Sequence, residues 1–237
     1  MAGIEIRGLK KSYELENGIL HVLQGLDLDL EEGAITVVRG KSGCGKTTLL
    51  RLTGGLEKPD GGSIHFHGSR KTAYVFQEPR LMPWLNVQEN VQFGLHKNQI
   101  RPEQIHRLIE TVGLAGFEKA RPAQLSGGMQ QRAALARALA YGPSFIMMDE
   151  PFAALDHFTR ENMQQELLRV RKAADASILF VTHSIDEALN LADRIVILAQ
   201  GRAAAEFAIA LPHPRDLLCE ELIRVRREIV AALGSAG

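Results

Sequence analysis

Short runs of apolar residues alternate along the chain with longer stretches in which apolar positions recur every three or four residues. The short runs are typical of β-strands and the longer ones of amphipathic helices, so the alternation predicts an α/β fold with a mostly parallel sheet. Phe145–Met148 and Ile178–Val181 are apolar throughout, as in central strands that are covered on both faces. Val22–Leu30 alternates between apolar and polar residues, which predicts a half-buried strand in an antiparallel β section at the N-terminal side.

The same patterns give bounds for each element. The predicted strands are Ile4–Arg7, Val22–Leu30, Ala34–Val38, Ser63–Phe66, Thr72–Phe76, Phe145–Asp149, Ser177–Thr182 and Arg194–Leu198. The predicted helices are Lys46–Thr53, Pro102–Val112, Gly127–Ala140, His157–Ala173 and Ile185–Leu191. The tail predicts a last amphipathic helix whose apolar face holds Leu218, Leu222, Val225 and Ile229. Arg202–Pro214, with two prolines, is predicted to be the connector into that helix.

Composition narrows the class of protein. The chain has 237 residues, 45% of them hydrophobic, which is ordinary for a folded globular protein. Lys and Arg together number 28 and so do Asp and Glu, and this balance gives no support to a nucleic-acid partner. No apolar run approaches the roughly 18 residues of a membrane-spanning helix, and the N-terminus lacks the apolar region of a secretory signal. The two cysteines lie far apart, so a disulfide framework or a structural zinc site is not expected.

The glycine-rich segment Gly40–Thr47 matches the GxxxxGK[ST] pattern of a phosphate-binding loop. It follows the predicted strand Ala34–Val38 and runs into the predicted helix Lys46–Thr53, which is the context that the pattern requires. Its glycines let successive backbone amides face one anion, and the helix N-terminus adds its positive dipole end. Lys46 is expected to reach the β- and γ-phosphates and the Thr47 hydroxyl to ligate Mg²⁺. Among these amides Cys44 is expected to have a lowered pKa and to be a modification site. The predicted ATP contacts here are Gly40, Lys41, Ser42, Gly43, Cys44, Gly45, Lys46, Thr47 and Thr48.

Two carboxylates lie next to each other at the end of the predicted buried strand Phe145–Asp149. Asp149 is its last residue, and Glu150 follows directly. Because side chains alternate along a strand, neighbouring Asp149 and Glu150 can serve different tasks. Asp149 is predicted to hold Mg²⁺ as the acidic partner of Thr47, and Glu150 to polarise the attacking water as general base.

The segment Leu125–Arg132 reads LSGGMQQR and begins a predicted helix with Ser126 as its N-cap. A helix start with a free hydroxyl and unpaired amides is a second anion site, which a head-to-tail pair of chains could offer to the nucleotide on its partner. LSGGM between the phosphate loop and the two carboxylates resembles the signature motif of ABC transporter ATPase subunits. This resemblance implies a P-loop ATPase core, a nucleotide-dependent homodimer, and ATP contacts from Ser126, Gly127 and Gly128.

The resemblance extends to other positions, one residue at a time. Gln77 matches the glutamine that senses Mg²⁺ or water and faces the membrane partner, and His183 matches the histidine that contacts the γ-phosphate. Asp156, in Ala154-Leu155-Asp156, matches the residue that communicates across the dimer. Tyr13 matches the aromatic residue that stacks on adenine, although it could equally pack at a sheet edge.

Some positions depart from the family pattern: Met129 stands where Gln is commonest, Ala153 where Ser is usual, and Ser184 where an acidic residue is common. None of these changes removes a phosphate ligand. The resemblance covers about residues 4–205, and it implies an ATPase domain over 1–205, a helical insert over about 87–140, and a short connector and helix over 206–237.

Separate membrane-spanning permease subunits are required if the chain serves a transporter, and the resemblance implies a peripheral place on the cytoplasmic face of the cell membrane, with a solute-binding protein as an indirect partner. The loop Glu78–Leu85 carries Met82 and Trp84 between prolines. It could form a groove for a partner helix or fold back onto the core.

The strings FQEPRLMPWLNVQENVQFGL and LPHPRD are similar to ATPases of the nitrate, sulfonate and taurine importers. The predicted solute is therefore a small oxyanion such as sulfonate, nitrate or taurine, and importers of thiamine precursors share much of the pattern. A non-transport ABC ATPase acting as a mechanical clamp is a second possibility, and a monomeric P-loop kinase or GTPase is a third. The third leaves LSGGM and His183 unexplained, and nucleotide-dependent dimerisation separates it from the others.

Overall fold

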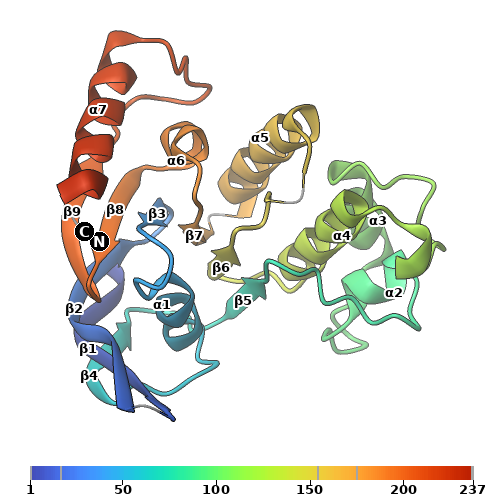
Figure 1. The fold of residues 1–237 in the computed structure, drawn as a ribbon. Coiled ribbons are helices and arrows are strands. Elements are labelled where there is room, and N and C mark those ends of the chain that lie inside the picture. The colour runs from blue at the N-terminus through green and yellow to red at the C-terminus, as the bar shows by residue number, and fades with distance from the viewer. Residues whose placement is uncertain (1, 17, 154, 175, 236–237) are drawn as a thin grey trace. The chain divides into compact units, whose positions relative to one another are not determined.

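The computed structural model describes residues 2–16, 18–153, 155–174 and 176–235 (Figure 1). The chain divides into two compact units. The first comprises Met1–Arg70 and Ala176–Gly237, and the second comprises Lys71–Asp175. Among the described ranges, no helix has the length and apolar character needed to cross a membrane.

An antiparallel sheet occupies one side of the first unit, in the strand order β2-β1-β4. Its strands are β1 (Ala2–Leu15), β2 (Gly18–Glu31) and β4 (Gly61–Phe66). In β2 the side chains of Leu26, Leu28 and Leu30 are buried while the residues between them are more exposed. The predicted half-buried antiparallel strand is therefore confirmed, and β1 extends well beyond the predicted Ile4–Arg7.

The other strands of the first unit surround β3 (Ile35–Arg39), which pairs in parallel with β7 (Ser177–Val181) and with β8 (Arg194–Ala199). β7 is buried along its whole length, as its apolar run predicts, and β3 is fully buried as well. β9 (Arg202–Ala208) pairs with β8 in antiparallel orientation. The unit also holds α1 (Lys46–Thr53), α6 (Ile185–Leu191) and α7 (Glu220–Ser235).

The second unit pairs β5 (Thr72–Val75) in parallel with β6 (Phe145–Asp149). Its helices are α2 (Val87–Gln92), α3 (Pro102–Thr111), α4 (Gly127–Ala140) and α5 (His157–Ala174), with a short 3₁₀ turn at Pro122–Gln124. α4 contacts both α2 and α3, and Figure 1 shows these three helices together. Small buried residues such as Ala133, Ala134 and Ala136 allow this close packing.

The predicted α/β class, with a parallel sheet, an antiparallel section and helices, is confirmed. Two parts of the prediction are wrong. Arg202–Ala208 is a strand and not a connector, because its main chain pairs with β8. Leu218 precedes α7 and is 81% exposed, so the apolar face of that helix consists of Leu222, Val225 and Ile229, which are buried.

Candidate nucleotide-binding and hydrolysis site

The predicted phosphate loop connects β3 to α1 in the first unit, and two of its glycines are required by close approach. A Cβ atom on Gly40 would lie 2.2 Å from the main-chain oxygen of Leu198. Gly45 has a φ of 106°, in the left-handed region, and a Cβ there would lie 2.8 Å from Cδ2 of Leu23. Only glycine fits at both positions, so the loop is held in a tight arc that ends at the first residue of α1.

Lys46 occupies the inside of this arc. Its side chain is buried, and its Nζ atom donates to the main-chain oxygens of Gly40 and Lys41, both at 2.9 Å. The next residue, Thr47, is half-buried, and Thr48 is buried. The structure therefore brings the predicted ammonium and hydroxyl groups together in the first turn of α1.

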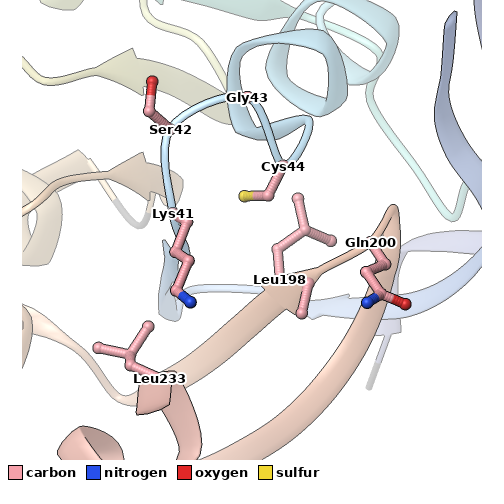
Figure 2. A pocket seen from close by; sticks show the side chains of 8 residues that line it. Lys41, Ser42, Gly43, Cys44, Leu198, Gln200 and Leu233 are labelled. Atoms are coloured by element: carbon pink, nitrogen blue, oxygen red, sulfur yellow. The ribbon is translucent and has the colours of Figure 1, made fainter. Parts of the chain in front are cut away.

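A pocket of about 270 Å³ lies beside the loop (Figure 2). Lys41, Ser42, Gly43 and Cys44 line it on the loop side, and Leu198, Ala199, Gln200 and Leu233 complete it. Burial raises the pKa of the Cys44 thiol, and the nearby charge of Lys46 opposes this shift without reversing it. The predicted lowering of this pKa is therefore wrong. Burial disfavours the thiolate more than the charge of Lys46 favours it.

Tyr13 lies on β1, close to α1. Its hydroxyl donates to Oε2 of Glu57 at 2.6 Å, and its side chain also hydrogen-bonds with Thr48. Burial and the bond to Glu57 raise the pKa of Tyr13. The phenol is therefore anchored beside the helix that begins in the phosphate loop, and stacking on adenine stays a prediction.

His183 follows β7 in the same unit, and its side chain is exposed. The residues around it are fixed by a short network. Ser184 caps α6 by accepting from the amide of Glu187 at 3.2 Å, and its own amide donates to Oγ1 of Thr182 at 3.0 Å. The Thr182 hydroxyl in turn donates to Glu187. Arg39, at the end of β3, donates from Nη2 to the main-chain oxygen of His183.

The carboxylates lie in the second unit, at the end of β6. Asp149 is buried, and the Tyr74 hydroxyl lies 3.5 Å from its Oδ2 atom. Glu150 is half-buried and has a φ of 47°. This conformation is costly for a residue with a side chain, and such strain is concentrated at functional sites.

Gln77 is exposed just after β5, and its flanking main chain is held by α4. Gln131 donates from Nε2 to the main-chain oxygen of Phe76 at 3.0 Å. Arg137 donates to the main-chain oxygens of Pro79 and Arg80, at 2.9 Å and 2.8 Å. Side chains of α4 thus hold the main chain on both sides of Gln77.

The signature segment begins α4 as predicted. Ser126 is the N-cap, and its Oγ atom accepts from the amide of Met129 at 3.3 Å. Gly127 is exposed, whereas a Cβ on Gly128 would lie 2.9 Å from Cδ2 of Leu155. Leu155 precedes Asp156, so the helix start touches the segment that was predicted to communicate across a dimer; Ala154 lies outside the described residues.

Asp156 is exposed and accepts from the amide of Thr159 at 3.0 Å, near the start of α5. Hydrogen bonds from Thr159 lower the pKa of Asp156. Its observed contact is therefore a helix cap, and the role between two chains stays a prediction.

The predicted residues fall into two sets. The phosphate loop, Tyr13 and His183 belong to the first unit, while Gln77, Ser126–Gly128, Asp149, Glu150 and Asp156 belong to the second. Sequence reasoning missed the residues that position them, chiefly Arg39 and Arg137. A signal for Arg39 existed, because it is the only charged residue in the strand ITVVR that enters the phosphate loop.

A phosphate loop that joins a buried parallel strand to a helix defines a nucleotide-binding α/β protein of the P-loop class. The ABC transporter family model matches residues 23–153. The chain belongs to the ABC transporter family, as an ATP-binding subunit. The resemblance in the sequence is thus confirmed at the level of the family, whose ATP-binding subunits hydrolyse ATP.

Relatives match over nearly their whole length. The chain is 42% identical over 243 residues to an uncharacterised ABC transporter ATP-binding protein of Methanocaldococcus jannaschii, covering 97% of this chain and 91% of the relative. It is 44% identical over 234 residues to an aliphatic sulfonates import ATP-binding protein of Nocardia farcinica, covering 99% and 93%.

Among solved structures, a dimeric ATP-binding cassette in a post-hydrolysis state, bound to ADP and Pi, matches with a TM-score of 0.81 at 30% identity. The match covers 88% of this chain and all of the solved one.

Proposed function

We propose that this chain is the ATP-hydrolysing subunit of a multi-subunit membrane importer for an aliphatic sulfonate. The observation that carries the proposal is the buried Lys46 ammonium held inside the phosphate loop, in a chain that is 44% identical to an aliphatic sulfonates import ATP-binding protein. The ATPase domain is inferred to comprise residues 1–205, with a helical insert over about 87–140 and a connector and helix over 206–237.

ATP binding rests on the first unit. Lys46 exchanges its two carbonyl partners for the β- and γ-phosphates, which are stronger acceptors because they are charged. The amides of Ser42–Thr48 and the start of α1 face the same anion. Tyr13, anchored through its hydroxyl by Glu57, offers its ring to the adenine.

Hydrolysis is proposed to use three polar side chains. Glu150 accepts the proton of the attacking water, Gln77 orients that water, and His183 contacts the γ-phosphate. Thr47, Gln77 and Asp149 offer hydroxyl, amide and carboxylate oxygens, the donor types that Mg²⁺ takes, so the residues fit this ion. When bound, Mg²⁺ would neutralise charge on the phosphates.

A second copy of the chain is the inferred partner for nucleotide. Ser126 and the two glycines after it begin a helix of 14 residues, whose unpaired amides and dipole suit a phosphate group. Two of the solved structures that match, both of one ATP-binding cassette, are described as dimeric. Two chains related head to tail would place each signature helix against the ATP of the other chain.

The membrane partner is inferred to dock in a groove of the second unit. A pocket of about 390 Å³ is lined by Phe76, Met82, Phe93, Ala138 and Tyr141, together with Arg80 and Arg137. Phe93 is 51% exposed. The lining is apolar with a basic edge, which suits a helical segment of a permease subunit that carries a carboxylate.

The loop Glu78–Leu85 has an anchored inner part and an exposed outer part. Asn90 is fully buried and bonds the main chain of Met82 and Leu85, which anchors the loop to α2. Trp84 is nevertheless 66% exposed. The outer part of the loop is therefore inferred to contact the permease on the cytoplasmic side of the membrane, with a solute-binding protein delivering the solute.

Uptake of a labelled alkanesulfonate tests this proposal. Cells that lack their own sulfonate-import ATPase but keep its permease and binding protein would receive this chain or its Glu150→Gln variant. Uptake with the wild-type chain and none with the variant is expected. Uptake of nitrate or a thiamine precursor in place of the alkanesulfonate, each with its own permease, would contradict the proposed solute while keeping the importer.

A further inference from the structure

Arg39 is a buried charge in an unusual place. It ends β3, and Gly40 opens the phosphate loop directly after it. Its side chain is only 8% exposed, although arginine is almost never buried without partners. Burial lowers the pKa of Arg39, and the carboxylates of Asp186 and Glu187 oppose that shift.

The guanidinium uses little of its hydrogen-bonding capacity. Nη2 donates to the main-chain oxygen of His183, whereas Nε and Nη1 are buried and have no hydrogen-bond partner among the described residues. Buried donors without partners destabilise a fold. An uncharged side chain of similar size would leave no buried donor without a partner. The stability of the fold therefore does not explain an arginine at this position.

The nearby carboxylates are engaged by other groups. Asp186 forms an ion pair with Arg226 of α7, and Glu187 accepts from the Thr182 hydroxyl. The bond from Arg39 to the His183 carbonyl is thus the specific contact of the guanidinium, and it joins residues 144 positions apart in the chain.

This contact extends the link between β3 and β7 beyond the end of their ladder, whose last paired residues are Val38 and Val181. Thr182, Ser184 and Glu187 form a local network around His183, in the turn between β7 and α6 and in the first turn of α6. Arg39 adds a side-chain bond from the residue that directly precedes the proposed phosphate loop. A shift of the phosphate loop relative to the His183 peptide would have to break or stretch this bond.

We propose that Arg39 is a positioning residue that holds the His183 main chain in register with the phosphate loop, so that the exposed imidazole meets the terminal phosphate of ATP. The inference rests on the proposed role of His183 in hydrolysis. Arg39 acts through His183 and does not itself touch the nucleotide.

Steady-state ATP hydrolysis by the full chain, with thermal unfolding measured on the same samples, tests the inference. In Arg39→Met the melting temperature is expected to stay unchanged or rise, because two unpaired donors disappear. The kcat is expected to fall by about 10- to 100-fold through misplacement of His183, with KM for ATP little changed. Arg39→Lys, which keeps one donor for the carbonyl, is expected to recover part of the lost kcat, and it carries the test by itself if Arg39→Met does not fold.

Arg215→Met is the matched control. Arg215 also donates to main-chain oxygens in the first unit, those of Leu189, Ala192 and Leu211, so its loss should lower the melting temperature without changing kcat. Wild-type kcat in Arg39→Met, beside an inactive His183→Ala, would overturn the role of Arg39 alone. Wild-type activity in His183→Ala would overturn the proposed role of His183 and the inference with it.

Discussion

Each unit uses an arginine to hold main-chain oxygens beside a predicted catalytic residue, but Arg39 is buried, Arg137 is half-buried, and they differ in how many of their donors are paired. Arg137 in the second unit donates to two carbonyls, those of Pro79 and Arg80, close to Gln77. Arg39 in the first unit donates to one, that of His183, and two of its nitrogen atoms have no hydrogen-bond partner within the described part of the chain.

The number of paired donors indicates whether an arginine stabilises the fold or positions another residue. An arginine that satisfies two carbonyls stabilises the segment it holds, and its removal leaves both carbonyls without their donor. A buried arginine with unpaired donors costs stability, so its presence points to another role. The same residue type therefore serves as an anchor in one unit and as a positioning residue in the other.

The largest expected effect concerns the strained carboxylate of the second unit. Glu150→Gln removes the proposed general base, and kcat for ATP is expected to fall by about 10²- to 10⁴-fold with ATP binding retained. Turnover and equilibrium binding of ATP on the same preparation measure this. Near-wild-type turnover would remove Glu150 from the role of base.

A complementary change in the first unit should affect binding. Lys46→Met removes the ammonium that the loop carbonyls now hold, and a loss of about 3 kcal/mol in ATP binding is expected because charged hydrogen bonds to two phosphates disappear. Calorimetric titration with ATP measures it, with Lys97→Met as the control, since the Lys97 side chain is exposed and is not a predicted ATP contact. Equal losses in the two variants would show that net charge matters and not the position of Lys46.

The unfolding free energies of two variants test the comparison between Arg137 and Arg39. Arg137→Met is expected to lower the free energy of unfolding by about 2 kcal/mol, because two carbonyls lose their donor. Arg39→Met should change it little or raise it. Chemical denaturation of both variants measures the contrast, and a larger loss for Arg39→Met would refute it.

The helix caps give a smaller effect. Ser126→Ala removes the N-cap of α4 and should cost about 0.5–1 kcal/mol of unfolding free energy, and so should Ser184→Ala at α6, because the cap bonds are 3.3 Å and 3.2 Å long. Only Ser126→Ala should also weaken nucleotide-dependent dimerisation, measured by light scattering. Equal dimerisation in the two variants would argue against a signature contact with nucleotide.

The smallest effect is a pH dependence at Asp156. Because hydrogen bonds from Thr159 lower its pKa in the folded chain, Asp156 contributes stability above its unfolded pKa, and this is lost as the pH falls through the folded value. Asp156→Asn should flatten this part of the acid limb of a stability profile while keeping the cap. An unchanged acid limb would contradict that assignment.

Much of the fold could be predicted because buried runs and alternating strands leave clear patterns. α1, α4, α6 and β6 have the predicted bounds. β9 was missed because its sequence, RAAAEFA, has little contrast between its two faces. The sequence signal for β9 was the pair Gln200-Gly201 between β8 and β9. Both residues have positive φ, as in the turn of a two-residue hairpin.

The short helix α2 was missed for a different reason. Six residues are too few to show a helical period, although Asn86 and Glu89 form a capping box that marks its start. Motif residues of the site could be predicted because each motif is local. The contacts of Arg39 with His183 and of Arg137 with Pro79 could not, since they join residues far apart in the chain.

The central claim is that this chain drives a membrane importer, and its most direct test is recovery of the tagged chain from detergent-solubilised membranes with identification of the bound proteins. The account predicts a multi-spanning permease, lost on Phe93→Asp in the exposed groove and kept on Phe158→Asp, a control at another exposed phenylalanine. Recovery with only soluble or nucleic-acid-associated partners would contradict it and favour a mechanical clamp.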